Sequence, residues 1–464
     1  MARIGGQTIP RSTLLLVGGE GVLIYLALLF ATVVRLPDTS LAWSCIKDPA
    51  TISRLLVVVL ICVVSFYYHD LYDLQLIRSL AQTSVKLLRG LGVALLVLGV
   101  AYLINSSLSP GEGVAIMAAP FIIIMMVTWR VSLRSLGSRT HGMERVLIAG
   151  SGTVGLKLIG EIQRRPEFNY KVIGALSERE NQECGDLSAP ILGSVADIER
   201  IATELRIDRI VVSLKERRGG MPTRALMRLK FKGIQIEDPY TLYERLTGRI
   251  VLENLSPSWF IFSNGFRKPW ILRFAKRASD LLIAVLGLAL SSPLMVLVAL
   301  VIILEDGFPI LYRQERVGLN GGLFKILKFR SMRAAPPNEK PSWTGDRDPR
   351  ITRVGKFIRT VRLDELPQFI NVLRGDMSVV GPRPEQPYFC DMLEEEIPYF
   401  GYRHTVRPGI TGWAQIKYGY GATTEDAWRK VELDLFYIKY LSGVLDLAIL
   451  FETAKVVFFG RGAR

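Results

Sequence analysis

The sequence has few of the side chains that build disulfide frameworks and soft metal centres. Its 464 residues include four cysteines, scattered without a Cys-x-x-Cys pair, and three histidines. This pattern excludes a disulfide framework and a zinc site, and it argues against a histidine-rich metal centre. The chain also lacks a Tyr-x-x-x-Lys pair. Short-chain dehydrogenases and sugar-nucleotide dehydratases use that pair as their catalytic base, so redox catalysis of this kind is disfavoured.

Acidic residues are scarce relative to basic ones. The 43 Asp and Glu face 58 Lys and Arg, giving a net charge of +15, and 49% of the residues are hydrophobic. Such a charge suits nucleic acid, anionic lipid headgroups or phosphate-bearing substrates. Because the hydrophobic content indicates membrane segments, lipid and phosphorylated substrates are favoured and nucleic acid is not expected. The length predicts two or three domains.

Four long apolar runs lie near the N-terminus, at residues 13–34, 53–68, 87–105 and 113–129. Each is near the length that a helix needs to cross a hydrocarbon core of about 30 Å, so residues 1–135 are predicted to form four transmembrane helices. The first run is too long, and too closely followed by others, for a cleaved signal peptide. Basic residues that include Arg11 and Arg130 place both ends of this block in the cytoplasm. Glu20 is either a functional intramembrane acid or a bundle-facing residue bonded to a neighbouring helix.

Residues 140–250 have the alternating pattern of a Rossmann-like α/β domain. Short apolar strands are predicted at 145–150, 171–177, 207–214 and 233–237, with helices ending near 164 and spanning 223–230. The first strand leads into Gly150, Gly152 and Gly155, a complete GxGxxG turn. Such glycines let backbone N–H groups approach a pyrophosphate. The alternatives are a nucleotide-binding turn and a fold in which the glycines are only structural. Residues 251–270 are expected to be a linker.

A fifth apolar run, Leu281–Leu304, is long enough to span a membrane but is predicted not to do so. Ser292 and Pro293 lie near its centre, where proline removes a helical hydrogen bond and serine hydroxyls can satisfy the freed carbonyls. Basic residues flank both ends, including Arg273 and Arg313. Flanks of the same sign favour both ends on one face. We therefore expect a re-entrant helix at about 276–304 that breaks at Ser292–Pro293 and returns to its own side of the membrane.

The segment from Asp346 to Glu385 holds two adjacent carboxylates, Asp364 and Glu365, among many basic residues. These basic residues are Arg347, Arg350, Arg353, Lys356, Arg359, Arg362, Arg374 and Arg383. An acidic pair within so much positive charge suits a site that handles phosphate and a divalent metal. The alternative is a purely structural role, in which the two carboxylates cap the N-terminus of a helix and form surface ion pairs.

The C-terminal region resembles the monotopic phosphoglycosyl transferases, and the whole chain resembles their large, membrane-spanning subclass, the polyprenyl-phosphate hexose-1-phosphate transferases of bacterial polysaccharide assembly. The motifs that carry this resemblance are Lys276-Arg277 with Asp280, Ser292-Pro293, KFRSM (328–332), LDELPQ (363–368), GDMS (375–378), GPRPE (381–385) and RPGITGWAQ (407–415). One departure is Arg362, where many members have serine or threonine. The implied catalytic domain, 271–464, is α-rich and monotopic, and its last helix, about 443–460, is expected to lie at the membrane interface.

The resemblance implies transfer of a hexose-1-phosphate from a UDP-sugar to a polyprenyl phosphate, with release of UMP. It assigns Asp364 as the nucleophile of a covalent phosphosugar intermediate, and Glu365 beside it as the ligand that completes a Mg²⁺ site with Asp364. Arg359 matches an arginine that the family needs for activity. The residues expected to bind substrate are Arg383 with its neighbours Pro382 and Pro384, then Lys328, Arg330, Lys276, Arg277 and Asp280.

Two other functions compete with this interpretation. The first is a membrane-anchored, NAD-dependent sugar-nucleotide dehydratase, against which the missing Tyr-x-x-x-Lys pair counts. The second is a non-catalytic scaffold for polysaccharide assembly, against which the intact Asp364–Glu365 pair counts. We expect a multi-pass protein of the bacterial inner membrane with a cytoplasmic catalytic domain. A homodimer and contacts with other polysaccharide assembly proteins are expected by analogy, and the sequence does not identify the sugar.

Overall fold

The computed structural model describes residues 2–4, 7–9, 11–35, 47–72, 80–109, 111, 113–140, 143–150, 152–178, 189–214, 221–253, 255–333, 348–419, 421 and 423–459. Arg347 therefore lies outside the described residues. The chain forms two compact units that meet in sequence at Asp238 and Pro239. The short strands β1 (Ala2–Ile4) and β2 (Gln7–Ile9) pair with each other near the N-terminus.

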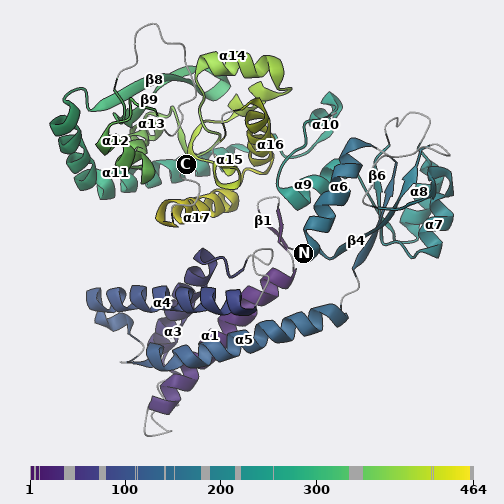
Figure 1. The fold of residues 1–464 in the computed structure, drawn as a ribbon, viewed down its shortest axis with the longest axis horizontal. Helices are drawn as coiled ribbons and strands as arrows, with labels where there is room; N and C mark the ends of the chain where they lie inside the picture. Colours follow the sequence, from purple (N-terminus) through teal and green to yellow (C-terminus); the bar gives the residue numbers. More distant parts are fainter. Residues whose placement is uncertain are drawn as a thin grey trace. The chain divides into compact units, whose positions relative to one another are not determined.

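Four long helices occur at the four predicted apolar runs. They are α1 (Arg11–Arg35), α3 (Pro49–Tyr68), α4 (Leu80–Ile104) and α5 (Val114–Thr140), with the short turn η1 (Ser106–Leu108) before α5. Helix α1 packs on α3 and α5, and α4 packs on α3 and α5 (Figure 1). Their shared core includes the fully buried Ile24, Leu55 and Leu87, whereas Leu60 and Leu96 are exposed. Apolar side chains on the outside of a helix group are expected where lipid is the solvent.

Glu20 faces the interior of this helix group. Its side chain is fully buried, and its Oε1 accepts a hydrogen bond from Arg130 Nε of α5 at 2.6 Å. Arg130 also donates to the carbonyl of Leu71 at 3.0 Å. Of the two alternatives for Glu20, the structure therefore favours the bundle-facing residue, because a buried charge in an apolar bundle needs such a partner.

The Rossmann-like domain has a five-stranded parallel sheet. Its strands are β3 (Glu144–Ala149), β4 (Tyr170–Ser177), β5 (Ile191–Ser194), β6 (Arg209–Val212) and β7 (Gln235–Glu237), in the order β5-β4-β3-β6-β7. Its helices are α6 (Thr153–Arg164), α7 (Ile198–Glu204) and α8 (Thr223–Phe231), with the turns η2 (Pro166–Phe168) and η3 (Val195–Asp197). In sequence order these strands are arranged 3-2-1-4-5, which is the classic doubly wound order 3-2-1-4-5-6 without its last strand. The sequence pattern missed β5, an edge strand without a fully buried residue, and α7, which has only seven residues.

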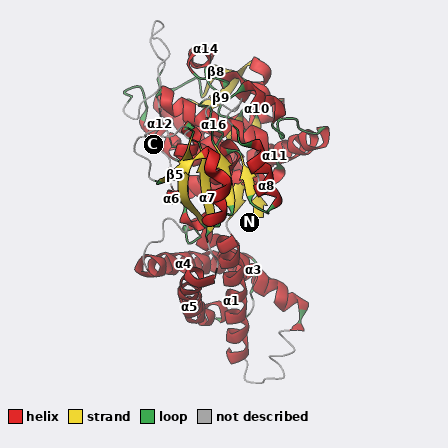
Figure 2. Cartoon of the chain, turned by 90° about the vertical axis from the view of Figure 1, so that its right-hand side faces the viewer, coloured by secondary structure: helices red, strands yellow, loops and turns green. Residues whose placement is uncertain are grey.

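Alternate residues of β3 explain why helices cover both faces of the sheet. Leu147 belongs to a cluster with residues of α7 and α8, such as Ile201 and Leu229, whereas Ile148 packs with Ile159 of α6. Successive side chains of a strand point to opposite faces, so a strand that is apolar throughout is buried on both. The sheet and its covering helices can be followed in Figure 2.

The second unit begins with helices α9 (Pro239–Thr247) and α10 (Pro257–Phe262), followed by the long α11 (Trp270–Asp306). An antiparallel pair, β8 (Leu311–Val317) and β9 (Leu323–Phe329), is joined through η4 (Leu319–Gly321). Then come α12 (Arg353–Thr360), η5 (Leu363–Glu365), α13 (Gln368–Arg374), β10 (Ser378–Val380), α14 (Pro387–Glu396) and η6 (Phe400–Thr405). The chain ends with β11 (Gly409–Thr411), which pairs in parallel with β10, and with α15 (Trp413–Lys417), α16 (Thr424–Tyr440) and α17 (Gly443–Phe459).

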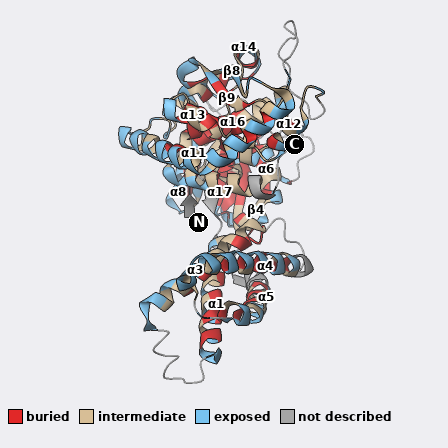
Figure 3. Ribbon diagram, turned by 90° about the vertical axis from the view of Figure 1, so that its left-hand side faces the viewer, coloured by how far each residue is buried: buried red, intermediate tan, exposed pale blue. Residues whose placement is uncertain are grey.

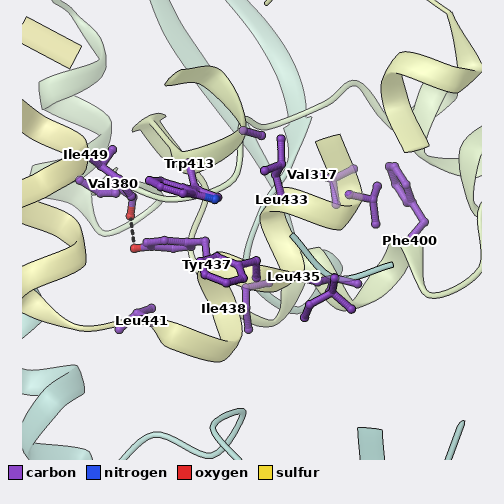
Figure 4. Packing of buried hydrophobic residues seen from close by; sticks show 14 of the residues in the cluster. Val317, Val380, Phe400, Trp413, Leu433, Leu435, Tyr437, Ile438, Leu441 and Ile449 are labelled. Carbon is purple, nitrogen blue, oxygen red and sulfur yellow. Dashed lines mark hydrogen bonds between the residues drawn. The ribbon is translucent and has the colours of Figure 1, made fainter. Parts of the chain in front are cut away.

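Helix α16 forms the centre of the second unit's core. Leu435, Phe436 and Tyr437 are fully buried, and Tyr437 donates from its hydroxyl to the carbonyl of Val380 at 3.0 Å (Figure 4). Ile250 and Leu252 belong to the same core, and Ile250 N–H bonds to the carbonyl of Glu432. The segment after Asp238 therefore packs with the second unit, although the sequence placed it in the Rossmann-like domain and the linker.

Helix α11 is continuous through Pro293, where we expected a break. The hydroxyl of Ser292 donates to the carbonyl of Ala289 at 2.9 Å, and Ser291 donates to that of Gly287 at 2.6 Å. Ala289 is four residues before Pro293, so its carbonyl is the one that proline leaves without a helical donor. Serine hydroxyls therefore replace the missing bond as expected, but within one helix. Much of α11 is exposed along its length (Figure 3), including Leu290 and Val296.

Candidate active site

Asp364 and Glu365 lie in the tight turn η5, between α12 and α13. Arg362, just before this turn, has the left-handed backbone conformation (φ 58°), which is uncommon for a residue other than glycine and clusters at functional sites. The residue that precedes α13 is Pro367, and no side chain caps this helix. The acidic pair is thus not a helix cap. The sequence predicted it at the start of a helix, whereas the structure places it in η5, one short turn before α13 begins.

Glu365 is held by two cations from different parts of the unit. Its Oε1 accepts from Lys328 Nζ of β9 at 2.8 Å and from Arg383, in the loop after β10, at 3.0 Å. The residue is only 9% exposed. Burial acts to raise the pKa of this carboxyl, but the charges of Lys328 and Arg383 outweigh it, so the pKa lies below its ordinary value. Glu365 is therefore a fixed anion.

Asp364 has a different environment although it is the next residue. It is 8% exposed, and within the described part of the chain its carboxylate has no hydrogen bond or ion pair. Burial raises the pKa of Asp364, the neighbouring charge of Glu365 adds to this, and Lys328, Arg383 and Arg359 oppose it. We expected a helix N-terminus to keep both acids ionised; instead surrounding side chains set the two pKa values in opposite directions. Asp364 thus presents an unengaged carboxylate that is close to positive charge.

Arg359 lies in the last turn of α12, where its NH1 group is 3.3 Å from Met332 Sδ. The sulfur of Met332 is a weak acceptor, so the guanidinium keeps most of its capacity to bind an anion. Its charge contributes to lowering the pKa of Asp364. The structure therefore brings together Asp364, Glu365, Lys328, Arg383 and Arg359.

The loop that carries Arg383 is fixed by its own backbone. The carbonyl of Pro382 accepts from Gly409 N–H at 2.8 Å, and that of Pro384 accepts from Arg316 at 3.1 Å. The carbonyl of Arg383 itself accepts from Arg403 at 3.0 Å, and Arg403 is paired with Asp434 at 2.8 Å. The two prolines thus position the loop through their carbonyls. Sequence reasoning missed Arg403 and Asp434, because nothing local links a residue of η6 to one in the middle of α16.

The other predicted substrate-binding residues make contacts within the protein. Arg330 donates to the carbonyls of Asp306 and Gly307, both at 2.6 Å, and so joins the end of β9 to the end of α11. At the other end of α11, Arg277 donates to the carbonyl of Val372 at 2.7 Å. Such contacts satisfy carbonyls at helix ends.

Lys276 and Asp280 also join α11 to its neighbours. Lys276 pairs with Asp446 of α17 at 2.8 Å. The buried Asp280 accepts from Ser378 Oγ and from Val379 N–H of β10, both at 3.0 Å. Together with Arg277 and Arg330, they fix α11 to the body of the unit.

A pocket with a volume of about 140 Å³ lies beside Glu365. Five apolar side chains line it: Leu366, which directly follows η5, and Phe369, Ile410, Ile416 and Val456 from α13, β11, α15 and α17. Arg362 and Glu365 also line it. We call it the Phe369 pocket. No local pattern in the sequence predicts it, because its walls come from residues between Arg362 and Val456 that are far apart along the chain.

The acidic pair fits Mg²⁺ as a partial ligand set. Carboxylate oxygens are ligands that Mg²⁺ prefers, and the ion commonly binds one or two carboxylates and completes its shell with water and substrate phosphate. No group of three or more His, Cys, Asp or Glu side chains that could hold a metal occurs among the described residues. Asp364 and Glu365 would therefore hold the ion only together with a phosphate ligand.

The glycine-rich turn of the Rossmann-like domain is closed by Ser213, which follows β6. Gly152 N–H donates to the carbonyl of Ser213 at 2.8 Å, and Gly155 N–H donates to its hydroxyl at 3.1 Å. Gly150 N–H bonds to the carbonyl of Leu176. A Cβ at any of the three glycines would collide with Ser213. These N–H groups are already bonded, so the geometry favours structural glycines over a phosphate-binding turn.

Lys328→Met is expected to move the acid limb of the pH–activity profile to higher pH. In the role that the sequence resemblance implies for Asp364, its carboxylate must be ionised, so activity is present above the pKa of Asp364 and is lost as pH falls through it. Removing the Lys328 charge, which lowers that pKa, raises it further. The measurement is kcat/KM against pH. Lys325→Met, which changes an exposed lysine of the same strand, should leave the limb in place.

Comparisons with known proteins identify relatives for both units. The family described as "Bacterial sugar transferase" matches residues 271–460, and the family described as "CoA-binding domain" matches residues 68–237. A UDP-N-acetylgalactosamine-undecaprenyl-phosphate N-acetylgalactosaminephosphotransferase of Aeromonas hydrophila is 39% identical over 66% of this chain and 70% of its own. A UDP-glucose:undecaprenyl-phosphate glucose-1-phosphate transferase of Escherichia coli is 32% identical over 70% of each chain. An undecaprenyl-phosphate galactose phosphotransferase of Salmonella typhimurium is 41% identical over 41% of this chain and 42% of its own.

Proposed function

The chain belongs to the bacterial sugar transferase family, and we propose that it transfers a hexose-1-phosphate from a UDP-sugar to undecaprenyl phosphate and releases UMP. The observation that supports this most directly is the unengaged carboxylate of Asp364 beside Glu365, Lys328, Arg383 and Arg359. The named relatives act on three different sugars, so the sugar is left open.

In the first step, an oxygen of Asp364 attacks the phosphorus that carries the sugar. The bond between this phosphorus and the bridging oxygen breaks, and UMP leaves with that oxygen and its electron pair. The product is a sugar-1-phosphoryl group bonded to Asp364. Lys328, Arg383 and Arg359 lie where they can neutralise phosphate oxygens, which is what an anionic nucleophile needs before it can approach an anionic phosphorus.

In the second step, an oxygen of undecaprenyl phosphate attacks the same phosphorus, and the bond to Asp364 breaks. The carboxylate is regenerated and the sugar diphosphate is linked to the lipid. Two steps allow a soluble donor and a lipid acceptor to use one site in turn. Glu365, held by Lys328 and Arg383, keeps the cations oriented throughout. Mg²⁺, when bound to the acidic pair, neutralises charge on the diphosphate of the donor.

The test is a UMP-release assay. Purified protein with Mg²⁺ and undecaprenyl phosphate should release UMP from one or more members of a UDP-sugar panel. Without undecaprenyl phosphate, UMP release should slow greatly once each enzyme molecule has reacted once. Absence of UMP with every donor would refute the proposed reaction.

The contacts at the two ends of α11 support a re-entrant arrangement. Arg277 bonds to the end of α13, and Asp306 accepts from Arg330, which follows β9. Strand β9 and helix α13 are themselves joined, because Leu327 N–H donates to Asn371 Oδ1 at 2.9 Å. A helix that crossed a hydrocarbon core of about 30 Å could not be fixed at both ends to one folded unit on one side. We therefore propose that both ends of α11 lie on the cytoplasmic face of the inner membrane.

Cysteine labelling tests this topology. In a variant without the four native cysteines, Arg273→Cys and Arg313→Cys change exposed residues on either side of the apolar part of α11. Both should resist an impermeant thiol reagent added outside intact cells, and both should react after the cells are opened. Labelling of only one in intact cells would mean that α11 spans the membrane. The homodimer and contacts with other polysaccharide assembly proteins stay predictions.

A further inference from the structure

The Phe369 pocket lies directly beside the reacting groups, yet its walls do not suit a sugar. The polar side chains on its walls are largely satisfied by the protein. Thr411 and Thr453 share a hydrogen bond of 2.7 Å, Thr453 also donates to the carbonyl of Ile449, and Gln415 donates to that of Ile410. Of the polar atoms named here, only Gln415 Oε1 has no partner among the described residues. A hexose in this space would leave most of its hydroxyl groups without partners, which is costly.

Two residues that line the pocket connect it to helices with exposed apolar side chains. Phe369, in α13, packs against Gly287 of the apolar helix α11. Val456 comes from α17, the helix expected at the membrane interface, whose Val444 and Leu447 are exposed. An apolar chain in the bilayer could therefore reach the pocket along apolar surface. Burying such a chain is favourable in proportion to the area removed from water.

Charged groups also line the pocket. One is Glu365, whose carboxylate is bonded to Lys328 and Arg383. The other is Arg362. A molecule that complements this lining has an apolar body and an anionic head that can meet the cations bonded to Glu365. The apolar walls match the chain of a lipid phosphate and not the sugar or the nucleoside of the donor, whereas the nearby cations suit the phosphate of either substrate.

We propose that the Phe369 pocket binds the phosphate-proximal isoprene units of the polyprenyl phosphate acceptor. This inference rests on the proposed function, since it assigns the acceptor of the second step. In that step the head group's oxygen attacks the phosphorus bonded to Asp364, the bond to Asp364 breaks, and the apolar stem stays in the pocket. Leu366, Phe369, Ile416 and Val456 then set the affinity for the acceptor, while the donor is bound elsewhere around the cations.

The test separates the two half-reactions. Ile416→Trp and Val456→Trp fill the pocket, and Leu447→Trp, on an exposed face of α17, is the matched control. We expect the two pocket variants to raise KM for farnesyl phosphate and for undecaprenyl phosphate by about tenfold or more. Exchange of labelled UMP into the UDP-sugar without acceptor should stay within about twofold of wild type. Ile416→Ala, which enlarges the pocket, provides a second test if a tryptophan variant does not fold.

Three results would overturn the inference. One is loss of UMP exchange with an unchanged acceptor KM, which would place the donor sugar in the pocket. Another is no change in either quantity. The third is an effect confined to the long acceptor, which would place the contact far from the phosphate. Crosslinking with a diazirine-bearing farnesyl phosphate reports where the acceptor binds and does not require the enzyme to turn over. If the wild type releases no UMP but crosslinks at α13 or α17, the proposed reaction fails and the pocket assignment stands.

Discussion

Asp364→Asn should lower turnover by at least about 10³-fold and abolish the covalent phosphosugar intermediate. An amide has nearly the shape of the carboxylate, so the variant keeps the fold of η5 but cannot attack phosphorus. Loss of an enzyme's nucleophile costs several orders of magnitude in kcat. Wild-type protein incubated with a UDP-sugar carrying label in the sugar should retain that label through denaturation. The Asp364→Asn variant should retain no sugar label after denaturation, and it should no longer exchange labelled UMP into the UDP-sugar.

Glu365→Gln is expected to behave differently from Asp364→Asn. Its carboxylate orients Lys328 and Arg383, so neutralising it should weaken donor binding and slow turnover while a labelled intermediate still forms. The exposed Asp391→Asn serves as the matched control and should leave both readouts unchanged. Full turnover by Asp364→Asn would show that this residue is not the nucleophile, even if the reaction is as proposed.

Local signals explain which parts of the fold the sequence predicts well. The helices α1, α3, α4 and α5 are set by runs of apolar residues, and β3 with α6 by a strand followed by GxGxxG. In both cases the information lies within about twenty neighbouring residues. The sequence did not predict β5 or α7. Strand β5 lies at the edge of the sheet and has no fully buried residue, so it lacks the apolar run that marks β6, and α7 has only seven residues in which to show a period.

Long-range pairing determines the rest of the site. Lys328 and Arg330 are two positions apart and were both expected to bind phosphate, yet one reaches Glu365 and the other reaches carbonyls at the end of α11. In the same way, Ser213 fills the glycine-rich turn from a strand about sixty residues away in sequence. Spacing along the chain does not determine these partners, because they depend on how β9 and β6 lie against other elements.

The buried pair of Arg403 and Asp434 gives the second large prediction. Both side chains are at most 5% exposed, and Arg403 donates to Asp434 at 2.8 Å and to the carbonyl of Arg383 at 3.0 Å. Arg403→Met leaves the charge of Asp434 buried without its partner. Breaking a buried pair in this way costs about 3–5 kcal/mol, which should lower the unfolding temperature of the detergent-solubilised protein by about 10 °C. The unfolding temperature is measured by monitoring the intrinsic fluorescence of the protein during heating.

A second substitution separates stability from positioning. Arg403→Met with Asp434→Leu removes both charges, and replacing a buried pair by apolar residues is often neutral or stabilising. The double variant should therefore recover most of the lost unfolding temperature. Its kcat/KM should stay reduced by about 10- to 100-fold, because the carbonyl of Arg383 still lacks its donor and the guanidinium that meets Glu365 loses its fixed position. If activity returned together with stability, Arg403 would serve the core alone, and the loop around Arg383 would hold its position through the carbonyls of Pro382 and Pro384.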